Sequence, residues 1–455
     1  MKVAVIGGGA AGLAAGVALK RAGVEVVLFE AEKSVGGKLR TVERDGFQCE
    51  DGPSSLTPQS VTAFRIARQH ALEVASAAPP RTRYVVRAGR MRAMAPPRLA
   101  GVLSPGAWAR LALEPLAVLR PGQRLKAQQD ESLRELMVRH LGAQAGGLAA
   151  NLLANGVYAG DPRRLSARDA FPRLSSLVEH SSSFFVGAVK RSLANRGQKA
   201  RGDQPQSLWI PAKGMGALAR ALASELGSGV RLWTRVERLA LATSGPGAFT
   251  LALADGQLQV DGVISALPPG EAARLLAPLA AGAEELKQIR SSPLVVVHLG
   301  YRIDDFARKP QGFGVLDGDG SLRLLGVLFP SSLFGGRAPE GHLLFTCLLG
   351  GLLHPEMLEL DDAALAALCR TDLQKLFGVT RPAVFERVAR WREAVPQPEL
   401  GHRERLARVR GALAGLPPLE LAGAAYDGVA VEQVLQGGEK AAERLLARLG
   451  VAPEV

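Results

Sequence analysis

The first 30 residues constrain the fold more than any other part of the chain. Two short β-prone runs, Lys2–Ile6 and Val24–Glu30, are separated by a glycine-rich turn and an alanine-rich segment, Gly12–Ala22, that is expected to be helical. This order predicts a βαβ unit, in which two parallel strands are joined across a helix. The fold must therefore contain a parallel sheet near its N-terminus.

The turn has the spacing of a dinucleotide-binding loop. Gly7, Gly9 and Gly12 fit G-x-G-x-x-G directly after a strand and at the start of a helix. The first glycine allows a tight turn, the second lets the backbone approach a pyrophosphate, and the third allows close helix–strand packing. The free N–H groups of the helix N-terminus would face the phosphates. Glu30 ends the second strand, where a carboxylate accepts both ribose hydroxyls and disfavours the 2′-phosphate of NADP.

A second glycine pair favours FAD over NAD. Gly36 and Gly37 follow shortly after Glu30, a pattern that is typical of FAD-binding chains. No second fingerprint follows, because Gly312-Phe313-Gly314 lacks the third glycine and a following helix. Electron transfer to oxygen or a quinone is therefore favoured over NADPH chemistry, and the chain is expected to be an oxidase. The alternative is a glycine-rich loop without a ligand.

Composition narrows the class of protein. With 455 residues, 47% of them hydrophobic and 22% charged, the chain is expected to form two or three packed globular units. Cys49, Cys347 and Cys369 show no C-x-x-C spacing, which argues against a metal site or a disulfide framework and suits a reducing compartment. The apolar start, Met1–Gly16, lacks a signal-type cleavage site, and no apolar run approaches the ~20 residues of a membrane span.

Positive charge is concentrated in one segment. The chain carries +13, and Arg81 to Arg124 contains nine arginines and one acid, Glu114, which gives 9 − 1 = +8. The segment also contains Trp108 and several leucines. It is either a solvated arginine-rich surface or a cationic amphipathic patch that contacts anionic lipid or an anionic substrate. Nucleic acid is not expected, because no recognition helix or base-stacking platform accompanies the charge.

Helical spacing dominates the middle of the chain. Asp130–Leu141 opens with Ser132-x-x-Glu135, a capping box, and residues 86–200 are expected to be mainly helical. Further helices are expected over Ser60–Leu72 and Val431–Leu449. The polar segment Asn195–Gln206 is expected to connect two units.

Strand patterns dominate the region that follows. Three runs are expected to form a mostly antiparallel sheet: Pro293–Tyr301, Leu322–Phe329 and His342–Gly350. Asp255-Gly256 predicts a hairpin turn ahead of Val260–Ser265.

Several further motifs are shared with one enzyme family. They are Gly52-Pro53-Ser54-Ser55, Arg83-Tyr84-Val85, Asn155-Gly156-Val157-Tyr158-Ala159-Gly160-Asp161, Leu165-Ser166, Phe171-Pro172, Gly312-Phe313-Gly314-Val315-Leu316, Pro396-Gln397, Gly401-His402 and the run Ala422 to Val431. Through them the chain resembles, over nearly its whole length, the oxygen-dependent protoporphyrinogen oxidase family of the flavin amine-oxidase superfamily.

The resemblance implies an α/β and α+β fold with three domains. A Rossmann-like FAD-binding domain would comprise residues 1–85, 201–268 and 396–455. A helical, membrane-associated domain would comprise residues 86–200, and an antiparallel-sheet substrate domain residues 269–395.

The resemblance also implies a reaction. Protoporphyrinogen IX would be oxidised to protoporphyrin IX by successive hydride transfers to FAD, with oxygen reoxidising the flavin and forming hydrogen peroxide, as a step of heme biosynthesis. No catalytic side chain is expected, because the flavin performs the hydride transfer. His402 is expected to be structural. The protein would be cytoplasmic and peripherally attached to the inner face of the cell membrane, with a homodimer as one option.

Six residues are expected to bind the tetrapyrrole. Arg83 would pair with a substrate carboxylate through its planar fork, and its alternative is an ordinary surface arginine. The others would line an apolar cavity for a flat macrocycle or, alternatively, simply pack in the core. They are Gly156, Phe313, Gly314, Leu316 and Leu348.

The expected FAD contacts combine the fingerprint with positions implied by the resemblance. Val429 to Val431 begin the last helix, whose N-terminus would stabilise negative charge on the reduced flavin ring. Ala424 stands where some amine oxidases carry a cysteine bonded to the flavin, so FAD is expected to be non-covalent. The full set is Gly7, Gly8, Gly9, Ala10, Ala11, Gly12, Glu30, Ala31, Gly37, Lys38, Gly52, Pro53, Ser54, Ser55, Val236, Trp391, Ala424, Val429, Ala430 and Val431.

The chain departs from the family pattern at Pro398, at Glu432-Gln433 and at Lys213-Gly214-Met215-Gly216. These departures leave open which porphyrinogen is the substrate. Oxidation of coproporphyrinogen III, which carries two more carboxylates, is the main alternative. An amine oxidase, a carotenoid desaturase or a non-catalytic flavin scaffold are the others.

Overall fold

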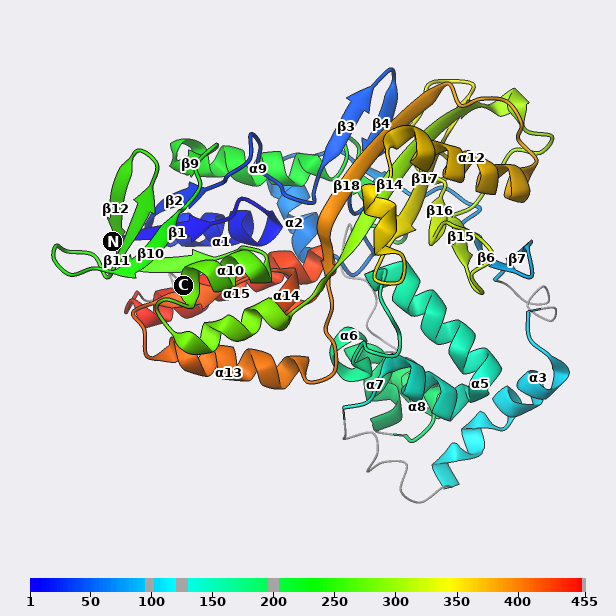
Figure 1. Ribbon diagram of the computed structural model, residues 1–455, viewed down its shortest axis with the longest axis horizontal. Coiled ribbons are helices and arrows are strands. Elements are labelled where there is room, and N and C mark those ends of the chain that lie inside the picture. The colour runs from blue at the N-terminus through cyan, green and yellow to red at the C-terminus, as the bar shows by residue number, and fades with distance from the viewer. Residues whose placement is uncertain (95–101, 120–129, 180, 195–203, 452–455) are drawn as a thin grey trace.

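Three units make up the molecule, and Figure 1 shows how they are arranged. The α/β unit, a second unit built on a large sheet, and a group of helices lie next to one another. The computed structural model describes residues 1–94, 102–119, 130–179, 181–194 and 204–451. Arg98, Arg120, Arg124 and most of the expected connection Asn195–Gln206 lie outside the described residues.

The α/β unit is built on a five-stranded parallel sheet with the order β19-β13-β1-β2-β9. The predicted βαβ unit is confirmed, since β1 and β2 pair in parallel across α1. The elements are β1 (Lys2–Ile6), α1 (Ala10–Arg21), β2 (Glu25–Phe29), β9 (Val230–Arg231), β13 (Gly262–Ser265) and β19 (Leu419–Leu421).

The two faces of this sheet are covered by different elements because side chains alternate along each strand. Val3 and Val5 pack into the cluster that contains residues of α1, α9 and α15. Ala4 and Ile6 face the opposite cluster, which includes the antiparallel strands β10–β12 and helices α10 and α13. The bounds are α9 (Gly216–Leu226), α15 (Val431–Arg448), β10 (Arg238–Leu241), β11 (Phe249–Leu253), β12 (Gly256–Val260), α10 (Pro269–Leu276) and α13 (His402–Ala414). The hairpin predicted at Asp255-Gly256 joins β11 to β12.

A seven-stranded sheet with the order β18-β14-β17-β16-β15-β6-β7 forms the second unit. All pairings are antiparallel except that of β15 with β6. The three predicted strand runs lie here, although β16 is shorter than expected. The bounds are β6 (Arg83–Arg87), β7 (Arg90–Ala93), β14 (Ser291–Arg302), β15 (Gly314–Asp317), β16 (Gly326–Leu328), β17 (His342–Gly350) and β18 (Phe385–Pro396).

The expected boundary between the FAD-binding domain and the helical domain is wrong at strands β6 and β7. The boundary placed between residues 85 and 86 falls inside β6. Val86 is buried in the core of the seven-stranded sheet, and β6 pairs with β15 along its length. Residues 83–93 therefore belong to this sheet rather than to the α/β unit or the helical unit.

The face of the large sheet that carries Val295, Val297 and Leu299 is covered by α12 (Asp362–Phe377). The opposite face receives the hairpin formed by β3 (Thr41–Arg44) and β4 (Phe47–Glu50), which Figure 1 shows beside β18. Phe47 stacks on Phe385 with ring centroids 4.5 Å apart. The hairpin therefore connects the α/β unit to the large sheet.

The helical unit contains α3 (Pro105–Ala112), the 3-10 segment η2 (Glu114–Leu119), α5 (Leu133–Leu153), the π-helical turn η3 (Ala154–Tyr158), α6 (Ala167–Ala170), α7 (Pro172–Glu179) and α8 (Phe184–Ala194). The predicted capping box is present: the Glu135 N–H donates to the Ser132 hydroxyl, and the Ser132 N–H donates to the Glu135 carboxylate. Among the described helices, none combines the length and apolarity required to cross a bilayer.

The remaining helices and strands are short connectors and edge pairs. They are α2 (Val61–Gln69), β5 (Val74–Ser76), β8 (Trp209–Pro211), η4 (Gly227–Gly229), η5 (Ala281–Gln288), η6 (Ile303–Asp305), α11 (Pro330–Leu333), η7 (Pro355–Glu359) and α14 (Ala424–Asp427).

Candidate functional site

The glycine loop after β1 has the geometry that its sequence predicts. Gly7 has φ +107°, a conformation that disfavours other residues. A Cβ on Gly12 would overlap the Gly7 carbonyl oxygen, so close packing of α1 on the loop requires glycine. A Cβ on Gly9 would meet nothing within 4 Å. The space beside Gly9 is therefore open at the helix N-terminus, where a pyrophosphate is expected to bind.

Glu30 lies directly after β2 and is held by the loop itself. Its carboxylate accepts hydrogen bonds from the N–H of Gly8 (2.8 Å) and of Glu32 (2.9 Å). These bonds orient the carboxylate beside the glycine loop, where it can accept ribose hydroxyls. Ala31 is exposed next to it. This arrangement fits the adenosine half of FAD.

The second glycine pair packs against the first. The Gly36 N–H donates to the Gly8 carbonyl at 2.7 Å, and Gly9 and Gly36 form a β-bridge. Gly37, with φ +54°, precedes Lys38, whose pKa is lowered by burial, although Glu393 opposes the shift. The two glycine segments thus form one cradle, in which the dinucleotide is expected to bind.

The segment Gly52–Ser55 leads from this cradle towards the large sheet. A Cβ on Gly52 would overlap the Lys38 carbonyl oxygen, so the two segments are in close contact. Pro53, Ser54 and Ser55 are half-buried. Trp391 of β18 donates from Nε1 to the Asp51 carbonyl at 2.6 Å. The structure thus brings two groups of expected FAD contacts, the loop Gly52–Ser55 and Trp391, together.

The C-terminal part of the expected flavin site lies at the start of α15. Ala424 is in α14, and Val429 packs against the core of the helical unit.

The departure of Glu432-Gln433 from the family pattern is explained by hydrogen bonds that these residues make nearby. Glu432 accepts hydrogen bonds from the N–H groups of Thr62 (2.8 Å) and Ala63 (3.1 Å), which cap α2. Gln433 accepts from the Ala430 N–H at 3.2 Å.

Val236 and His402 both make hydrogen bonds with other residues of the protein. The Val236 carbonyl accepts a hydrogen bond from Arg274 at 3.0 Å, and the side chain is buried. Its expected contact with FAD stays a prediction. His402 Nε2 lies 3.0 Å from the Ala425 carbonyl, and burial lowers the pKa of the ring. This arrangement agrees with a structural role for His402.

The expected substrate residues gather on one region of the large sheet. Arg83 pairs in register with Gly314, and its guanidinium lies 5.0 Å from the centroid of the Phe313 ring. Leu316 and Leu348 both neighbour Gly326 across β16. Their side chains are partly exposed, although most neighbouring strand residues are buried. Partial exposure of Leu316 and Leu348 agrees with a position in the wall of a cavity.

Gly156 reaches the same region from the helical unit. A Cβ on Gly156 would lie 3.1 Å from a Leu316 methyl group, so little space separates them. The residue belongs to the π-helical turn η3, a feature found frequently at functional sites. The Tyr158 carbonyl at the end of this turn accepts from Ser292 and Gln397, both at 2.9 Å. The turn is thereby fixed to the strand ends of the large sheet.

Two groups of buried charges were not singled out from the sequence. Glu50, whose pKa burial raises to about 7, contacts Arg337 and the Met215 N–H. Asp51 contacts Arg387 and His298. His298 is a single histidine inside the apolar run of β14. It was the sequence signal that could have indicated the buried charges around Asp51.

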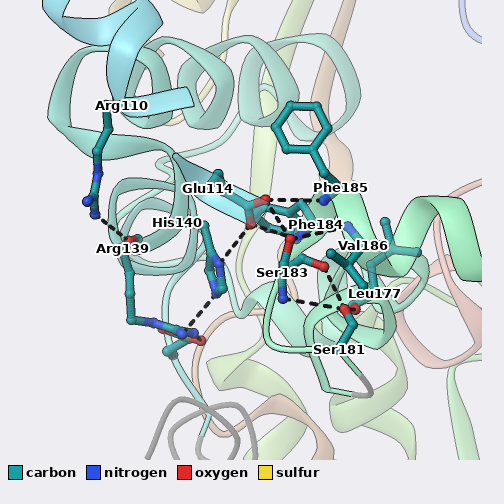
Figure 2. A network of polar contacts seen from close by, with 11 residues as sticks. Arg110, Glu114, Arg139, His140, Leu177, Ser181, Ser183, Phe184, Phe185 and Val186 are labelled. Atoms are coloured by element: carbon teal, nitrogen blue, oxygen red, sulfur yellow. Dashed lines mark hydrogen bonds and ion pairs between the residues drawn. The ribbon is translucent and has the colours of Figure 1, made fainter. Parts of the chain in front are cut away.

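In the helical unit, the lone acid of the arginine-rich segment is buried. Figure 2 shows the Glu114 carboxylate between two helices: it accepts from the Ser183 hydroxyl (2.6 Å) and from the N–H groups of Phe184 (2.7 Å) and Phe185 (3.3 Å). His140 Nδ1 lies 3.3 Å from it. Burial raises the pKa of Glu114, but these bonds outweigh burial and leave the pKa lowered. Glu114 therefore joins η2 to the N-terminus of α8.

Exposed apolar side chains surround this junction. On α8, Phe185, Val189 and Leu193 lie four residues apart and are 49%, 59% and 51% exposed. The apolar stripe, as we call these three residues, is flanked by the exposed Lys190 and Arg191. The preceding helices expose Trp108, Leu113, Leu116 and Val118.

Neither a metal site nor a disulfide is present in the part of the chain that the structure describes. No group of three or more metal-binding side chains occurs among those residues. The three cysteines are free and buried.

Comparison with known proteins shows the family of the chain. The family model for flavin containing amine oxidoreductase matches residues 10–446. The bovine (Bos taurus) protoporphyrinogen oxidase is 30% identical and is covered over 98% of both chains. Chloroplastic protoporphyrinogen oxidase 1 from Spinacia oleracea is 29% identical (96% of this chain, 83% of the relative). The coproporphyrinogen III oxidase of Bacillus subtilis is 27% identical over 98% of both chains.

Solved structures show the same fold. A protein from Exiguobacterium sp. 255-15 superposes with a TM-score of 0.81 at 23% identity, over 99% of each chain. A putrescine oxidase bound to putrescine superposes with a TM-score of 0.73 at 18% identity, covering 98% of this chain and 99% of the other.

Proposed function

The chain belongs to the family of flavin containing amine oxidoreductases, and we propose that it oxidises protoporphyrinogen IX to protoporphyrin IX in heme biosynthesis. It is an FAD-dependent oxidoreductase. The observation that carries the proposal is the convergence of Arg83, Phe313, Leu316, Leu348 and Gly156 on the large sheet beside the α/β unit. Relatives named protoporphyrinogen oxidase match nearly the whole chain.

The cofactor cradle fits FAD at both ends of its adenosine diphosphate half. The open space at Gly9 suits the pyrophosphate, and the oriented carboxylate of Glu30 suits the ribose. When bound, FAD supplies the hydride acceptor, which is chemistry that no side chain can provide. The methyl group at Ala424 offers no nucleophile for a covalent bond, which supports non-covalent binding.

The proposed roles of the substrate residues follow from their chemistry. Arg83 binds a propionate carboxylate, because a guanidinium forms two parallel hydrogen bonds with it. Its contact with Phe313 holds the guanidinium near the apolar wall. Leu316 and Leu348 contribute that wall, and Gly156 packs against Leu316 at its edge, where a side chain would displace the leucine. The site thus matches a flat, apolar molecule with an acidic edge.

The N-terminus of α15 supports the flavin end of the site. Its N–H groups and positive dipole end stabilise negative charge, and Val429 to Val431 lie at this end. Oxygen is the proposed final acceptor, with hydrogen peroxide as its product.

Coproporphyrinogen III is the second candidate substrate. It carries two more carboxylates, and the β6–β7 hairpin that begins with Arg83 carries further arginines, namely Arg87, Arg90 and Arg92. The Bacillus subtilis relative is named coproporphyrinogen III oxidase. The same cavity could therefore select substrates by the number of carboxylates that these arginines bind.

A parallel assay distinguishes the two substrates. Purified protein containing FAD is mixed with protoporphyrinogen IX or coproporphyrinogen III in air, and porphyrin fluorescence and peroxide are followed. Faster fluorescence with protoporphyrinogen IX, together with peroxide, is the expected result. Preference for coproporphyrinogen III would assign the second substrate instead. No turnover of either would exclude the porphyrinogen proposal while leaving FAD binding intact.

We also propose that the helical unit rests on the inner face of the cell membrane. The apolar stripe (Phe185, Val189 and Leu193) lies beside Lys190 and Arg191, a combination that binds anionic lipid surfaces. The exposed apolar residues of α3 and η2 lie close by, because Glu114 fixes η2 to α8. The protein would therefore attach peripherally from the cytoplasm.

Vesicle sedimentation tests this attachment. The protein is expected to bind phosphatidylglycerol vesicles more tightly than phosphatidylcholine vesicles, and Val189→Glu should reduce binding to both. Val384→Glu is the matched control, because Val384 is also an exposed valine (51%) but lies just before β18. Equal loss of vesicle binding in the two variants would contradict the proposal that the apolar stripe of α8 contacts the membrane. Light scattering of the protein without vesicles would test whether it forms the homodimer that the resemblance leaves as one option.

A further inference from the structure

A buried ion pair connects the cofactor cradle to the large sheet. Asp51 is fully buried, and its carboxylate accepts hydrogen bonds from Arg387 Nε (3.2 Å) and Nη2 (2.5 Å). His298 Nε2 lies 3.5 Å from Asp51 Oδ1. The aspartate follows β4, whereas Arg387 and His298 lie on β18 and β14. These three residues are called the Asp51 cluster below.

The protonation of the Asp51 cluster follows from its contacts. Burial raises the pKa of Asp51, but His298 and Arg387 outweigh burial and leave the pKa lowered, so the carboxylate is ionised. Burial lowers the pKa of His298, so its ring is neutral and carries one N–H. The Thr346 hydroxyl lies 3.0 Å from Nδ1 and can donate to it, which leaves Nε2–H to face Asp51. The cluster therefore contains one negative and one positive charge.

On its other side, Asp51 is joined to the cradle. The Asp51 N–H donates to the Arg40 carbonyl at 2.9 Å, and the next residue, Gly52, is pressed against Lys38. Lys38 follows the glycine pair whose Gly36 donates to the phosphate-binding loop. The side chain of Asp51 thus anchors the loop Asp51–Ser55 to the large sheet. The backbone of the same loop contacts the dinucleotide cradle.

The anchor lies in the same row of the sheet as the substrate arginine. Residues paired directly across a sheet point to the same face. The pairings run without a break from Arg387 to His298, Thr346, Leu328, Gly314 and Arg83. Four strand spacings of about 4.8 Å separate His298 from Arg83, which places their backbones roughly 19 Å apart.

We propose that Asp51 is a positioning residue that fixes the expected FAD-binding loop, Gly52–Ser55, at a set distance from Arg83. Arg387, with His298 beside it, holds the loop at one end of the row, and Arg83 binds the substrate carboxylate at the other. The large sheet then determines how far the substrate lies from the cofactor. The role depends on FAD as the cofactor and not on which porphyrinogen is oxidised.

The test compares two buried aspartates. Asp51→Asn removes the charge that faces Arg387 and keeps the shape of the side chain. Asp372→Asn is the matched control, because Asp372 is also fully buried and accepts from the N–H groups of Arg323 (2.7 Å) and Leu324 (3.3 Å). Asp372 lies on α12, which covers the opposite face of the sheet. Arg387→Lys keeps the charge but not the paired hydrogen bonds.

Three quantities are measured without any porphyrinogen: the thermal midpoint, the dissociation constant of FAD from the apoprotein, and the midpoint potential of the bound flavin. Asp51→Asn is expected to weaken FAD binding roughly tenfold or more. It should also raise the potential, because the cluster gains a net positive charge. Asp372→Asn should lower the thermal midpoint only. Arg387→Lys should give an intermediate effect on FAD binding.

The proposal fails if Asp51→Asn alters FAD affinity and flavin potential no more than Asp372→Asn does. If Asp51→Asn does not fold, Arg387→Lys decides the same question: unchanged FAD affinity and potential in that variant would also overturn the role. Because neither readout requires turnover, an inactive wild-type protein would contradict the substrate proposal and leave this one testable.

Discussion

At the level of single residues, Gly9 and Gly12 differ in what surrounds them. Gly12→Ala should impair folding, because the new methyl group would overlap the Gly7 carbonyl oxygen. Gly9→Ala should leave the thermal midpoint of the apoprotein nearly unchanged and weaken FAD binding roughly tenfold or more, because the methyl group would occupy the space of the pyrophosphate. Fluorescence titration with FAD measures the second effect.

Gly106→Ala is the control for Gly9→Ala, since a Cβ there also meets nothing within 4 Å but lies in α3, far along the chain from the cradle. Normal FAD binding in Gly9→Ala would show that the open space next to Gly9 is not the pyrophosphate site.

Arg83 gives a second prediction at this scale. Arg83→Ala should raise the KM for protoporphyrinogen IX by roughly tenfold to a hundredfold, because a hydrogen bond to a charged group contributes about 1.5–3 kcal/mol. Arg83→Lys should recover part of this loss, since it keeps the charge and loses the planar fork. Steady-state kinetics would check both.

Arg302→Ala removes another exposed arginine, at the end of β14, and should leave the KM unchanged. An equal rise in KM for Arg302→Ala would mean that general surface charge, and not the position of Arg83, attracts the substrate.

The conformation of a loop could be predicted where the residues that determine it are neighbours in the chain, while the FAD contacts of these residues stay predictions. The cradle depends on local spacing from Gly7 to Glu30, and the structure has the expected geometry. The Asp51 cluster was missed because positions 51, 298 and 387 become neighbours only through the register of β14 and β18. Arg83 could be singled out from eight nearby arginines only through a family resemblance.

At the level of elements, the junction of η2 and α8 depends on Glu114. Glu114→Gln should destabilise the protein by roughly 1.5–3 kcal/mol, because it weakens charged hydrogen bonds to the start of α8. The lowered pKa makes this contribution fully present above about pH 4.3, the unfolded value for glutamate. It is lost as the pH falls through the lower folded pKa.

Thermal unfolding of wild type and Glu114→Gln at several pH values checks this prediction. The difference between them should be largest near neutral pH and shrink below about pH 4. The exposed Glu443 on α15 offers a control, since Glu443→Gln should have little effect at any pH. A difference that stays constant down to low pH would contradict an ionised Glu114.

Elements with a strong local pattern could be predicted, and those defined by distant pairing could not. Strands β14 and β17 are long apolar runs, and both agree with the expected ranges. Strand β6 is short and bounded by arginines, and its partner β15 follows more than 200 residues later. The predicted domain boundary fell inside β6 for this reason. Only the pairing of β6 with β15 shows that residues 83–93 belong to the large sheet.

At the level of the whole molecule, the three units meet around the proposed cavity. The α/β unit contributes the cradle, the large sheet contributes Arg83 and the apolar wall, and the helical unit contributes Gly156. Phe313 packs against the core of the α/β unit while its ring faces Arg83. The substrate site is therefore complete only when all three units are assembled, which is why no single stretch of sequence defines it.

Anaerobic mixing with protoporphyrinogen IX tests the central claim most directly. The visible absorption of the bound flavin and the fluorescence of the product are followed together in the absence of oxygen. Because one flavin accepts two of the six electrons that the full oxidation releases, we expect the flavin absorption to bleach without oxygen. When air is admitted, the flavin absorption should return and protoporphyrin IX should accumulate. A flavin that stays oxidised in the presence of excess protoporphyrinogen IX would contradict it.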